Sequence, residues 1–559
     1  MATGLGAYFT TLPLKGNLVV DLWYESSGHY PQSADQAVVY KAQLERTGLI
    51  TVNLHAADYA SFQNYMTEAG NMPVFMTGYS LPDYIDADDY FYPMLHSVGG
   101  SYYHDGYNST EMDRLIGQER TTLNTTQRAQ LFHQLQELSV QDTPMVPVFQ
   151  SKAWAVTKPD VSGVVLDETQ VMRYWLISLP AEKDTLVVGT TESIETNIDP
   201  AASWAYFSSV LISNLGAPLV YIKPGSVAGP DDFTPGLAAR WSYSPDGLTW
   251  TFDLKQGLKF SDGTEFTADA VKYSFDRGIG LASDTGPYVG LGYSDMIANV
   301  TAPSKYRVVL TLKYPVAWFL ALLAFSGSSI VNPEYAPMNK AVDYVEGNAA
   351  ASNPNDLGPY VLTEWVRLAG KEYEMKLDSN PNYFGASEGY PKVKHIVFRF
   401  YSDATSLGLA MRSGDVDMAF RHLTPTDIKN MQTDPSLKVW EGTGGTTMYM
   451  AFQEKIPPFD NPKVRQAIAA ALDRKELVDT VFLGQAVPLY SMIPMGMNFY
   501  EPLFKTLGDG NITFTVSTLR ELGYTENATN PASQTWLGVA GVGIVLAVAG
   551  AAIQTRKKK

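Results

Sequence analysis

The stretch from residue 446 to residue 480 constrains the fold more than any other part of the chain, because all of its local signals agree. It begins with large apolar residues at alternate positions, namely Met448, Met450 and Phe452. This period of two predicts a strand with one buried face. Asn461 and Pro462 then have the residue types of an N-cap and a first helical turn, and Asp473 with Glu476 forms a capping-box pattern. The stretch therefore predicts a strand and two helices, as in an α/β lobe.

The composition sets wide limits on fold and function. The chain has 559 residues, of which 45% are hydrophobic and 18% are charged, so it can bury large cores and should form at least two lobes. Its net charge of −17 argues against a nucleic-acid-binding protein, which needs basic patches to neutralise phosphates. Because the chain has no cysteine, disulfides and cysteine-bound metals are excluded.

The chain carries none of the common catalytic or nucleotide-binding motifs. The GxSxG, HExxH and P-loop patterns are absent, and the glycines of GTGGTT at 442–447 lack the spacing of a GxGxxG motif. The seven histidines are scattered without the spacing of metal ligands. We therefore expect a protein that is not an enzyme and that uses no metal or cofactor.

Two motifs resemble those of a known family. The order AF, PPFDN, KVRQAIA, DR and ELV in residues 451–478 is similar to the start of the second lobe in the family 5 extracellular solute-binding proteins. These proteins serve ABC importers of peptides, nickel chelates and oligosaccharides. The segment RWSYSPDGLTWTFDLKQGLKFSDGTEFTADAVKYSFDR at 240–277 is the most diagnostic, and we interpret its residues as scaffold. Its Pro-Asp-Gly at 245–247 predicts a hairpin turn, after which Trp250, Phe252 and Leu254 should be buried at alternate positions. The resemblance implies an α/β, two-lobe, periplasmic-binding-protein-like fold of class II with an extra subdomain.

The family's segments stand in an unusual order. Residues 182–526 resemble the opening part of the family, and residues 1–181 resemble its closing part. Because the two parts do not duplicate each other, a circular permutation is the simplest interpretation. An assembly artefact and a fusion of fragments from two genes are the alternatives. The implied division is residues 1–154 and 448–526 for lobe B, 155–447 for lobe A with a subdomain at about 226–350, and 527–535 for a linker.

The C-terminal stretch predicts a membrane anchor. Residues 536–553 hold no charge and would be roughly 27 Å long as a helix, enough to span a bilayer. The basic residues in 554–559 favour a cytoplasmic tail, which places the lobes at the cell surface, anchored in the plasma membrane. A buried core helix is the alternative. Residues 1–20 lack the pattern of a signal peptide, so the sequence does not explain how such a chain is exported.

The loop at residues 78–93 is the first candidate for a binding site. It contains four aspartates among several tyrosines, namely Asp83, Asp86, Asp88 and Asp89. The resemblance implies that Asp83 pairs with the α-ammonium group of a peptide, although Tyr79 replaces the family's tryptophan and Asp83 comes one residue late. An ion pair suits a closing cleft, because a buried cation needs a partner. The alternatives are a solvated acidic loop and a structural calcium site, although no glycine stands where an EF-hand requires one.

The other candidate ligand contacts are aromatic or acidic residues near the expected cleft, namely Tyr79, Tyr84, Trp440, Tyr449 and Glu192. Tyr449 stands on the strand expected to form a hinge, Trp440 lies shortly before it, and Glu192 follows the first strand of the family order. An aromatic ring with a polar tip suits a wet ligand cleft, but each of these residues has a packing role as its alternative.

These observations lead to one main functional hypothesis and three alternatives. The chain is expected to be a membrane-anchored extracellular solute-binding protein that delivers peptide to ABC permease subunits by cleft closure. An oligosaccharide is the second candidate ligand. A surface protein that has lost solute binding is another alternative, and a hydrolase that uses the carboxylates of residues 83–89 is the third.

Overall fold

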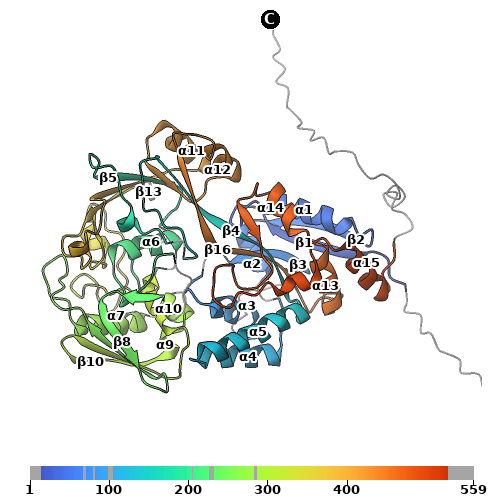
Figure 1. The fold of residues 1–559 in the computed structure, drawn as a ribbon, viewed down its shortest axis with the longest axis horizontal. Coiled ribbons are helices and arrows are strands. Elements are labelled where there is room, and N and C mark those ends of the chain that lie inside the picture. Colours follow the sequence, from blue (N-terminus) through green and yellow to red (C-terminus); the bar gives the residue numbers. More distant parts are fainter. Residues whose placement is uncertain are drawn as a thin grey trace, which may run out of the picture.

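Two long, paired strands cross the centre of the molecule and join its two halves. The computed structural model describes residues 14–526 except 67–70, 80–81, 99–104, 170, 195–196, 204, 226–231 and 282–285. Strand β4 (Met145–Thr157) runs antiparallel to β16 (Lys438–Phe452), and Figure 1 shows them passing from one half to the other. Their register shifts between Thr443 and Thr447, within the glycine-rich stretch.

These two strands lie inside an 11-stranded sheet with the order β12-β13-β14-β5-β15-β4-β16-β3-β1-β2, and β17 pairs with β4 beside this path. The other strands of the sheet are β1 (Leu18–Glu25), β2 (Ile50–Ala57), β3 (Val74–Tyr79), β5 (Thr185–Thr190), β12 (Tyr360–Leu368), β13 (Lys371–Ser379), β14 (His395–Phe400), β15 (Met418–Phe420) and β17 (Ala486–Pro488). The pairs β1–β2, β1–β3, β14–β5 and β15–β5 are parallel, which is typical of α/β folds.

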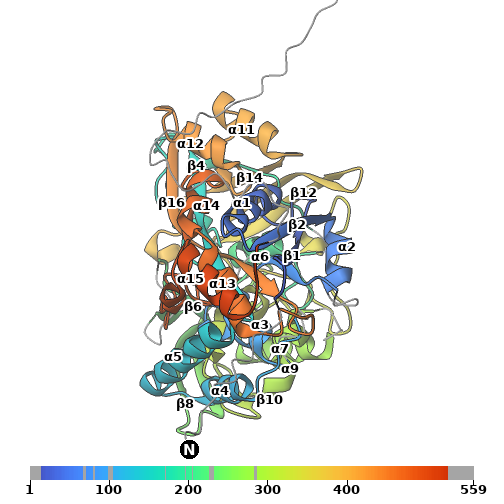
Figure 2. The same cartoon turned by 90° about the vertical axis from the view of Figure 1, so that its right-hand side faces the viewer.

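One half of the molecule, which we call lobe B, combines both ends of the described chain in a single core made mostly of residues 18–149 and 448–524. Figure 2 shows its blue and red elements intermixed. Arg46, after the first helix, pairs with Glu476 at 2.6 Å. The helices of lobe B are α1 (Ser33–Glu45), α2 (Tyr59–Asn64), α3 (Tyr92–Leu95), α4 (Thr110–Thr121), α5 (Thr125–Asp142), α13 (Pro462–Ala471), α14 (Arg474–Thr480) and α15 (Ile512–Glu521).

The stretch at 446–480 folds as predicted in its helices and differs in its strand. Asn461 accepts a hydrogen bond from the backbone N–H of Lys463 (3.0 Å), and Asp473 accepts one from that of Glu476 (2.8 Å), so both predicted N-caps are confirmed. In the strand, all of residues 447–452 are buried rather than alternate ones alone. The reason is that β16 is a central strand, held between β4 and β3 with both faces covered.

The other half, lobe A, has its own core and a subdomain. The core packs the β5 side of the large sheet against α6 (Tyr206–Leu215), with α11 (Ala404–Ser413) and α12 (Pro425–Met431) on the other face. The hairpin predicted around residue 246 forms, and its alternate residues Trp250, Phe252 and Leu254 are buried as expected. The subdomain elements are β6 (Val220–Ile222), β7 (Phe233–Pro235), β8 (Ala238–Tyr243), β9 (Thr249–Leu254), β10 (Ile297–Ser304), β11 (Arg307–Leu312), α7 (Ala268–Leu281), α8 (Pro287–Gly290), α9 (Tyr293–Met296) and α10 (Phe319–Ala324).

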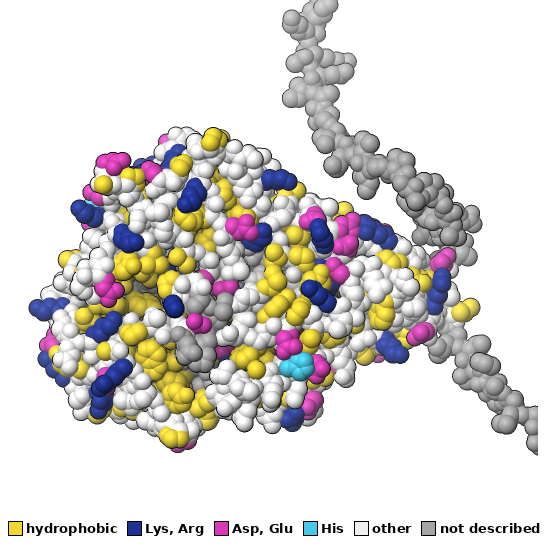
Figure 3. Space-filling view, viewed as in Figure 1, with side chains coloured by type: hydrophobic (Ala, Val, Ile, Leu, Met, Phe, Trp, Pro, Cys, Tyr) yellow, Lys and Arg dark blue, Asp and Glu magenta, His cyan; other side chains and the backbone are white. Residues whose placement is uncertain are grey.

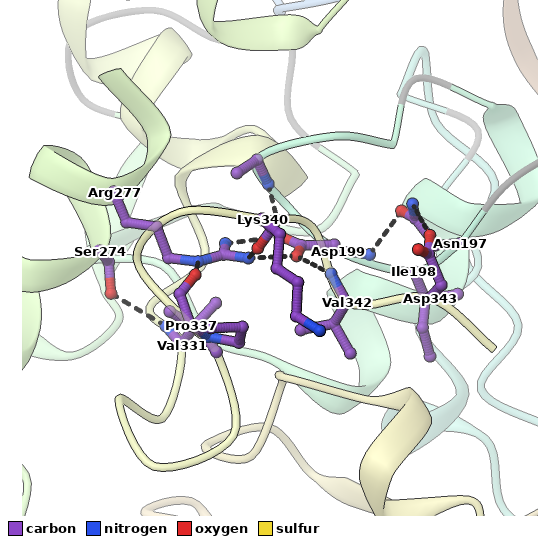
Figure 4. Close-up of polar contacts among 12 residues, drawn as sticks. Asn197, Ile198, Asp199, Ser274, Arg277, Val331, Pro337, Lys340, Val342 and Asp343 are labelled. Atoms are coloured by element: carbon purple, nitrogen blue, oxygen red, sulfur yellow. Dashed lines mark hydrogen bonds and ion pairs between the residues drawn. The ribbon is translucent and has the colours of Figure 1, made fainter. Parts of the chain in front are cut away.

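A buried ion pair fastens the subdomain to the rest of lobe A (Figure 4). The carboxylate of Asp199 accepts two hydrogen bonds from the guanidinium of Arg277 on α7, at 2.9 and 2.5 Å. Both side chains are at most 1% exposed. Arg277 also donates to the backbone carbonyls of Pro337 and Lys340. Every charged atom of the pair therefore has a partner, as a buried pair requires.

The two ends of the described chain lie side by side on lobe B. The backbone N–H of Lys15 donates to the carbonyl of Gly523 (2.7 Å), and that of Thr525 donates to the carbonyl of Lys15 (2.9 Å). The Lys15 ammonium lies 4.9 Å from the centre of the Tyr524 ring. Residues 14 and 526 are thus close enough for a short connection to join them.

The predicted membrane anchor lies outside the described residues. The linker at 527–535, the anchor at 536–553 and the tail at 554–559 all belong to this undescribed part. Among the helices of the described residues, none is both long and apolar enough to cross a bilayer. The anchor therefore stays a prediction from the sequence.

Two carboxyl groups near the end of β16, one buried and one half-buried, should make the stability of lobe B depend on pH. Burial raises the pKa of Asp105 to about 7 and that of Glu454 to about 7, although Arg465 partly offsets the shift. The folded chain then holds protons that the unfolded chain releases near pH 4, so this contribution to stability falls as the pH rises towards 7. We expect the melting temperature of Asp105→Asn to fall less than that of the wild type between pH 5 and pH 8. Equal slopes would contradict this assignment, and Asp160→Asn, an exposed site, is the control.

Candidate functional site

A cavity of about 960 Å³ lies between the two lobes. Lobe B contributes the loops that follow β1 and β3, and lobe A contributes the loops that follow β5 and β15 together with α6. These loops lie at the carboxyl ends of their strands, where ligands bind in open α/β sheets. Figure 3 shows apolar side chains gathered on both sides of the boundary between the halves. The volume and mixed lining suit a small ligand.

The loop after β1 forms an aromatic part of the lobe B wall. The rings of His29 and Tyr59 stack with their centres 3.7 Å apart, and Tyr30 packs edge-on against His29. Glu25, at the end of β1, accepts backbone hydrogen bonds from His29 (2.8 Å) and Tyr30 (3.2 Å). The carboxylate of Glu25 therefore fixes the loop that carries His29 and Tyr30, and Tyr59 comes from α2.

An ion-pair network holds the acidic loop at 78–93 against the helices α4 and α5. Asp86 accepts two hydrogen bonds from the guanidinium of Arg128 on α5, at 2.6 and 2.7 Å. Arg128 also donates to Glu119 of α4 (2.9 Å), and all three side chains are at most 11% exposed. Burial raises the pKa of Glu119 well above its usual value. The network anchors the loop to both helices.

Asp88 and Asp89 also turn inward, which leaves Asp83 at the cavity. The buried carboxylate of Asp88 accepts hydrogen bonds from the Tyr84 hydroxyl (2.7 Å) and from Arg120 (3.0 Å). Asp89, which is buried, accepts the backbone N–H of Asp83 (2.8 Å). The alternative of a solvated acidic loop is thus wrong for these inner aspartates, and Asp83 and Tyr84 line the cavity. Within the described ranges, no three His, Asp or Glu side chains are arranged to hold a metal ion.

Tyr84 also connects the two lobes away from the crossing strands. Its ring stacks on that of Trp318 in the subdomain, with centres 4.2 Å apart and planes 13° apart. The backbone N–H of Ala317 donates to the carbonyl of Arg120 in α4 (3.0 Å), and the Arg120 guanidinium lies 5.2 Å from the Trp318 ring. The loop that carries Asp83 is therefore part of a direct contact between lobe B and lobe A.

The lobe A wall carries a cluster of charged residues. Glu192 lies after β5, and its carboxylate is 3.4 Å from the guanidinium of Arg421 and 3.1 Å from the ring nitrogen of His422. Burial raises the pKa of Glu192, but the charge of Arg421 and a hydrogen bond to His422 outweigh it, so that pKa is lowered. The Arg421 guanidinium lies over the ring of Tyr206, 3.9 Å from its centre. All four residues line the cavity.

Two of the sequence candidates take other positions, and the side chain of a third is not described. The Tyr449 ring is buried, and its hydroxyl donates to the carbonyl of Met492 (2.9 Å). Trp440 donates its indole N–H to Thr157 (2.9 Å), and neither residue is among those that line the cavity. Both belong to β16, which packs side chains on each face. Tyr79 ends β3 opposite Thr447, and its side chain lies outside the described part of the structure.

Sequence reasoning missed most of the lobe A wall. Arg173, Trp175, Tyr206, Arg421 and His422 line the cavity but carry no motif. The sequence held one signal for two of these residues, because Arg421 and His422 come directly after the short apolar run of β15. They stand at the carboxyl end of a strand that pairs in parallel with β5, where ligands bind in open α/β sheets.

Replacing Gly445 with alanine should destabilise the contact between the lobes. A Cβ at this position would lie 2.5 Å from the carbonyl oxygen of Glu168 in lobe A and 2.6 Å from Cδ of Pro82 at the cavity. We expect a loss of about 1–3 kcal/mol in the free energy of unfolding, because the added methyl overpacks the site. Urea denaturation measures this loss.

Gly117→Ala is the matched control, because a Cβ there meets nothing within 4 Å in helix α4. This substitution should stabilise the chain by roughly 0.5–1 kcal/mol. A Gly445→Ala variant as stable as the wild type would show that the close approach is not tight.

Comparison with known proteins gives partial matches to peptide-binding proteins. Di/tripeptide-binding protein 2 of Pseudomonas aeruginosa is 30% identical over 338 residues, which cover 58% of this chain and 61% of that protein. The probable D,D-dipeptide-binding periplasmic protein DdpA of Escherichia coli is 30% identical over 323 residues, covering 57% and 59%. The chain thus spans about three fifths of the length of these curated relatives.

A solved structure and a family model also match. DppA, an ABC transporter-associated periplasmic binding protein from Helicobacter pylori in complex with the peptide STSA, matches at 23% identity and a TM-score of 0.45, over 61% of this chain and 66% of that chain. The model for "Bacterial extracellular solute-binding proteins, family 5 Middle" matches residues 232–537, more than half of the chain. The chain therefore belongs to family 5 of the bacterial extracellular solute-binding proteins.

Proposed function

We propose that the chain binds a peptide in the cavity between its lobes. The observation that carries this proposal is that Asp83 is among the residues that line the cavity, on a loop that Asp86, Asp88 and Asp89 fix through hydrogen bonds. A carboxylate in such a cleft suits the α-ammonium group of a peptide, because a desolvated cation needs a charged partner. The relatives include di/tripeptide- and dipeptide-binding proteins, which supports the same ligand class.

In this proposal, peptide binding closes the lobes and the closed form docks on the permease subunits of an ABC importer. The strands β4 and β16 are the only elements of the described chain that we place at the hinge, and their register shift between Thr443 and Thr447 supports bending there. A ligand that contacts both walls binds the closed form better, and this difference in affinity shifts the population.

Asp83→Asn should weaken peptide binding at least about tenfold, which corresponds to about 1.4 kcal/mol. The reason is that an amide cannot form the ion pair with the ammonium group. Isothermal titration calorimetry of the full-length protein with the dipeptide Ala-Leu and with its N-acetylated form measures the effect. The wild type should prefer the free amine, and the variant should lose that preference.

Asp160→Asn is the control, because Asp160 is exposed and does not line the cavity. Its affinities should match those of the wild type. If the wild type binds the N-acetylated dipeptide as tightly as the free one, Asp83 does not have the role proposed here.

An oligosaccharide remains the second candidate ligand, and the aromatic lining favours it. Tyr30, Tyr59, Trp175, Tyr206 and Tyr221 all line the cavity, and flat rings pack well against sugar faces. Titration with neutral oligosaccharides decides between the two ligand classes, and a surface protein that no longer binds solute would respond to neither.

The circular order and the membrane anchor complete the proposal. The pairing of Lys15 with Gly523 and Thr525 supports a family order in which the segment at 519–524 once continued into the segment that starts near Gly4. A chain rebuilt in that order, with its ends near residue 181, should fold with the same circular dichroism spectrum.

The anchor at 536–553 would hold the lobes at the cell surface, and resistance of the full-length chain to alkaline extraction from membranes tests it.

A further inference from the structure

The carboxylate of Glu25 is the centre of a hydrogen-bond network behind the lobe B wall. Glu25 ends β1 and is 1% exposed. One of its carboxylate oxygens accepts both the backbone N–H and the hydroxyl of Ser27. The other oxygen accepts the backbone N–H of His29 (2.8 Å) and that of Tyr30 (3.2 Å). A single buried side chain therefore accepts four hydrogen bonds from the loop that follows β1.

These hydrogen bonds keep the carboxylate ionised and give the loop its shape. Burial alone would raise the pKa of Glu25, but the hydrogen bonds from the loop, those of Ser27 first, outweigh it and lower that pKa. Gly28 stands among the donors with a φ of 94°, which a residue with a side chain adopts only with strain. The loop can therefore turn back onto the carboxylate, and the protein itself fixes its shape.

Ser27 extends the network to a second element. Its hydroxyl, which donates to Glu25, accepts the backbone N–H of Tyr59 (3.2 Å) at the start of α2. The backbone N–H and the hydroxyl of Ser26 both donate to the carbonyl of Ala57, at 2.8 and 3.0 Å, just before α2. The loop after β1 and the first turn of α2 are thus fixed relative to each other.

The two elements joined in this way carry a stacked pair of rings at the cavity. His29 comes from the loop and Tyr59 from α2, and their ring planes are 21° apart with centres 3.7 Å apart. Both residues line the cavity, whereas Glu25 and Ser27 are not among the described residues that line it. Because the stack depends on how the loop and the helix lie relative to each other, the network behind it determines how the rings meet a ligand.

We propose that Glu25 and Ser27 are positioning residues for solute binding, which act by holding the stacked rings of His29 and Tyr59 against the bound ligand. This inference rests on the proposed function, and it names the part of the lobe B wall that contacts an apolar part of the ligand, such as a peptide side chain. Aromatic rings supply a large contact area, and rings that are already fixed lose little freedom on binding.

The first measurement follows the stack itself, by NMR of the full-length protein with labelled histidine. The ring signals of His29 should be shifted upfield by the stacked Tyr59 ring, and their loss in His29→Ala assigns them. Glu25→Gln keeps the shape of the side chain but replaces one oxygen with an NH₂ group that cannot accept hydrogen bonds, so the shift should move towards that of free histidine. Ser27→Ala should act in the same way. Ser26→Ala, at the adjacent exposed serine, is the matched control and should leave the shift unchanged.

The second measurement is calorimetry with the dipeptide Ala-Leu. We expect His29→Ala and Glu25→Gln each to weaken binding about fivefold, because each removes the same aromatic contact. The double variant should lose little more than the weaker of the two, whereas independent effects would multiply to about 25-fold. A general loss of stability would not produce this coupling. Ser27→Ala, at an exposed position, gives the same test if the buried substitution prevents folding.

Asp356→Asn is the control for the loss of a buried carboxylate. Asp356 is 4% exposed, accepts the backbone N–H of Ser261 (3.0 Å), and is not among the described residues that line the cavity. Its substitution should lower the melting temperature without changing the affinity. An unchanged His29 signal in Glu25→Gln, an unchanged affinity in these variants, or losses that multiply would overturn this inference while solute binding itself stands. If the wild type does not bind Ala-Leu, the proposed peptide binding fails and this inference fails with it.

Discussion

Replacing Asp199 with alanine should lower the free energy of unfolding by about 3–5 kcal/mol. The substitution leaves the Arg277 guanidinium at 1% exposure without its carboxylate, and a buried unpaired charge is costly. It also removes the acceptor for the backbone N–H groups of Ala201 and Val342, at 3.0 and 2.8 Å. Because this pair fastens the subdomain to lobe A, the loss should appear as earlier unfolding of lobe A in urea.

The control for this prediction is Asp479→Ala. Asp479 pairs with Lys475 one turn away on α14, and their side chains are 53% and 74% exposed. A solvent-exposed pair of this kind contributes little to stability, because water screens its two charges. If Asp199→Ala costs no more than Asp479→Ala, then Asp199 and Arg277 do not fasten the subdomain as described.

Tyr84→Ala should both destabilise the chain and separate the lobes. Tyr84 is 6% exposed and its ring stacks on Trp318, so truncation leaves a cavity at the contact between lobe B and the subdomain. Loss of a large buried aromatic side chain typically costs about 3–5 kcal/mol. We expect a larger radius of gyration in small-angle X-ray scattering and weaker peptide binding, since Tyr84 follows Asp83 directly.

Tyr243→Ala is the matched control for this second prediction. Tyr243 packs on Trp250 with ring centres 4.6 Å apart, but it is 51% exposed and both rings belong to the subdomain. Its removal should leave the radius of gyration unchanged. A Tyr84→Ala protein with wild-type scattering and wild-type affinity would show that the stack does not hold the lobes together.

Local structure could be predicted from the sequence where neighbouring residues decide it. The N-caps at Asn461 and Asp473 and the buried side of the hairpin at Trp250 depend on residues a few positions apart, and all three are confirmed. The alternation at 448–452 predicted one buried face, but β16 is covered on both. That difference arises because the neighbours of β16 are β4 and β3, which come from the other end of the chain.

The candidate site could not be predicted in full, because it depends on contacts between residues that are far apart in the chain. Asp86, Asp88 and Asp89 look like a solvated acidic run in sequence, yet each is held by a partner or turned inward through contacts with α4, α5 or the loop itself. Glu192 was a sequence candidate, but its neighbour Arg421 was not, because more than two hundred residues separate them in the chain. Only the pairing of β15 with β5 brings the two together.

The permuted segment order stays a prediction, and the sequence could indicate it for a different reason. Each family segment keeps its own local pattern, so the order of the segments could be compared with that of the family without any structure. The fold then accommodates this order because the two ends of the described chain pair at Lys15 and Thr525, and because β4 and β16 still cross between the lobes.

We expect the cavity between the lobes to bind one peptide. Native mass spectrometry of the full-length protein, mixed with a dipeptide library and separately with neutral oligosaccharides, tests it most directly. We predict a single peptide adduct per chain that Asp83→Asn weakens and Asp160→Asn preserves. A protein that stays free of peptide at every concentration, or that takes up only oligosaccharide, would contradict the proposed peptide binding.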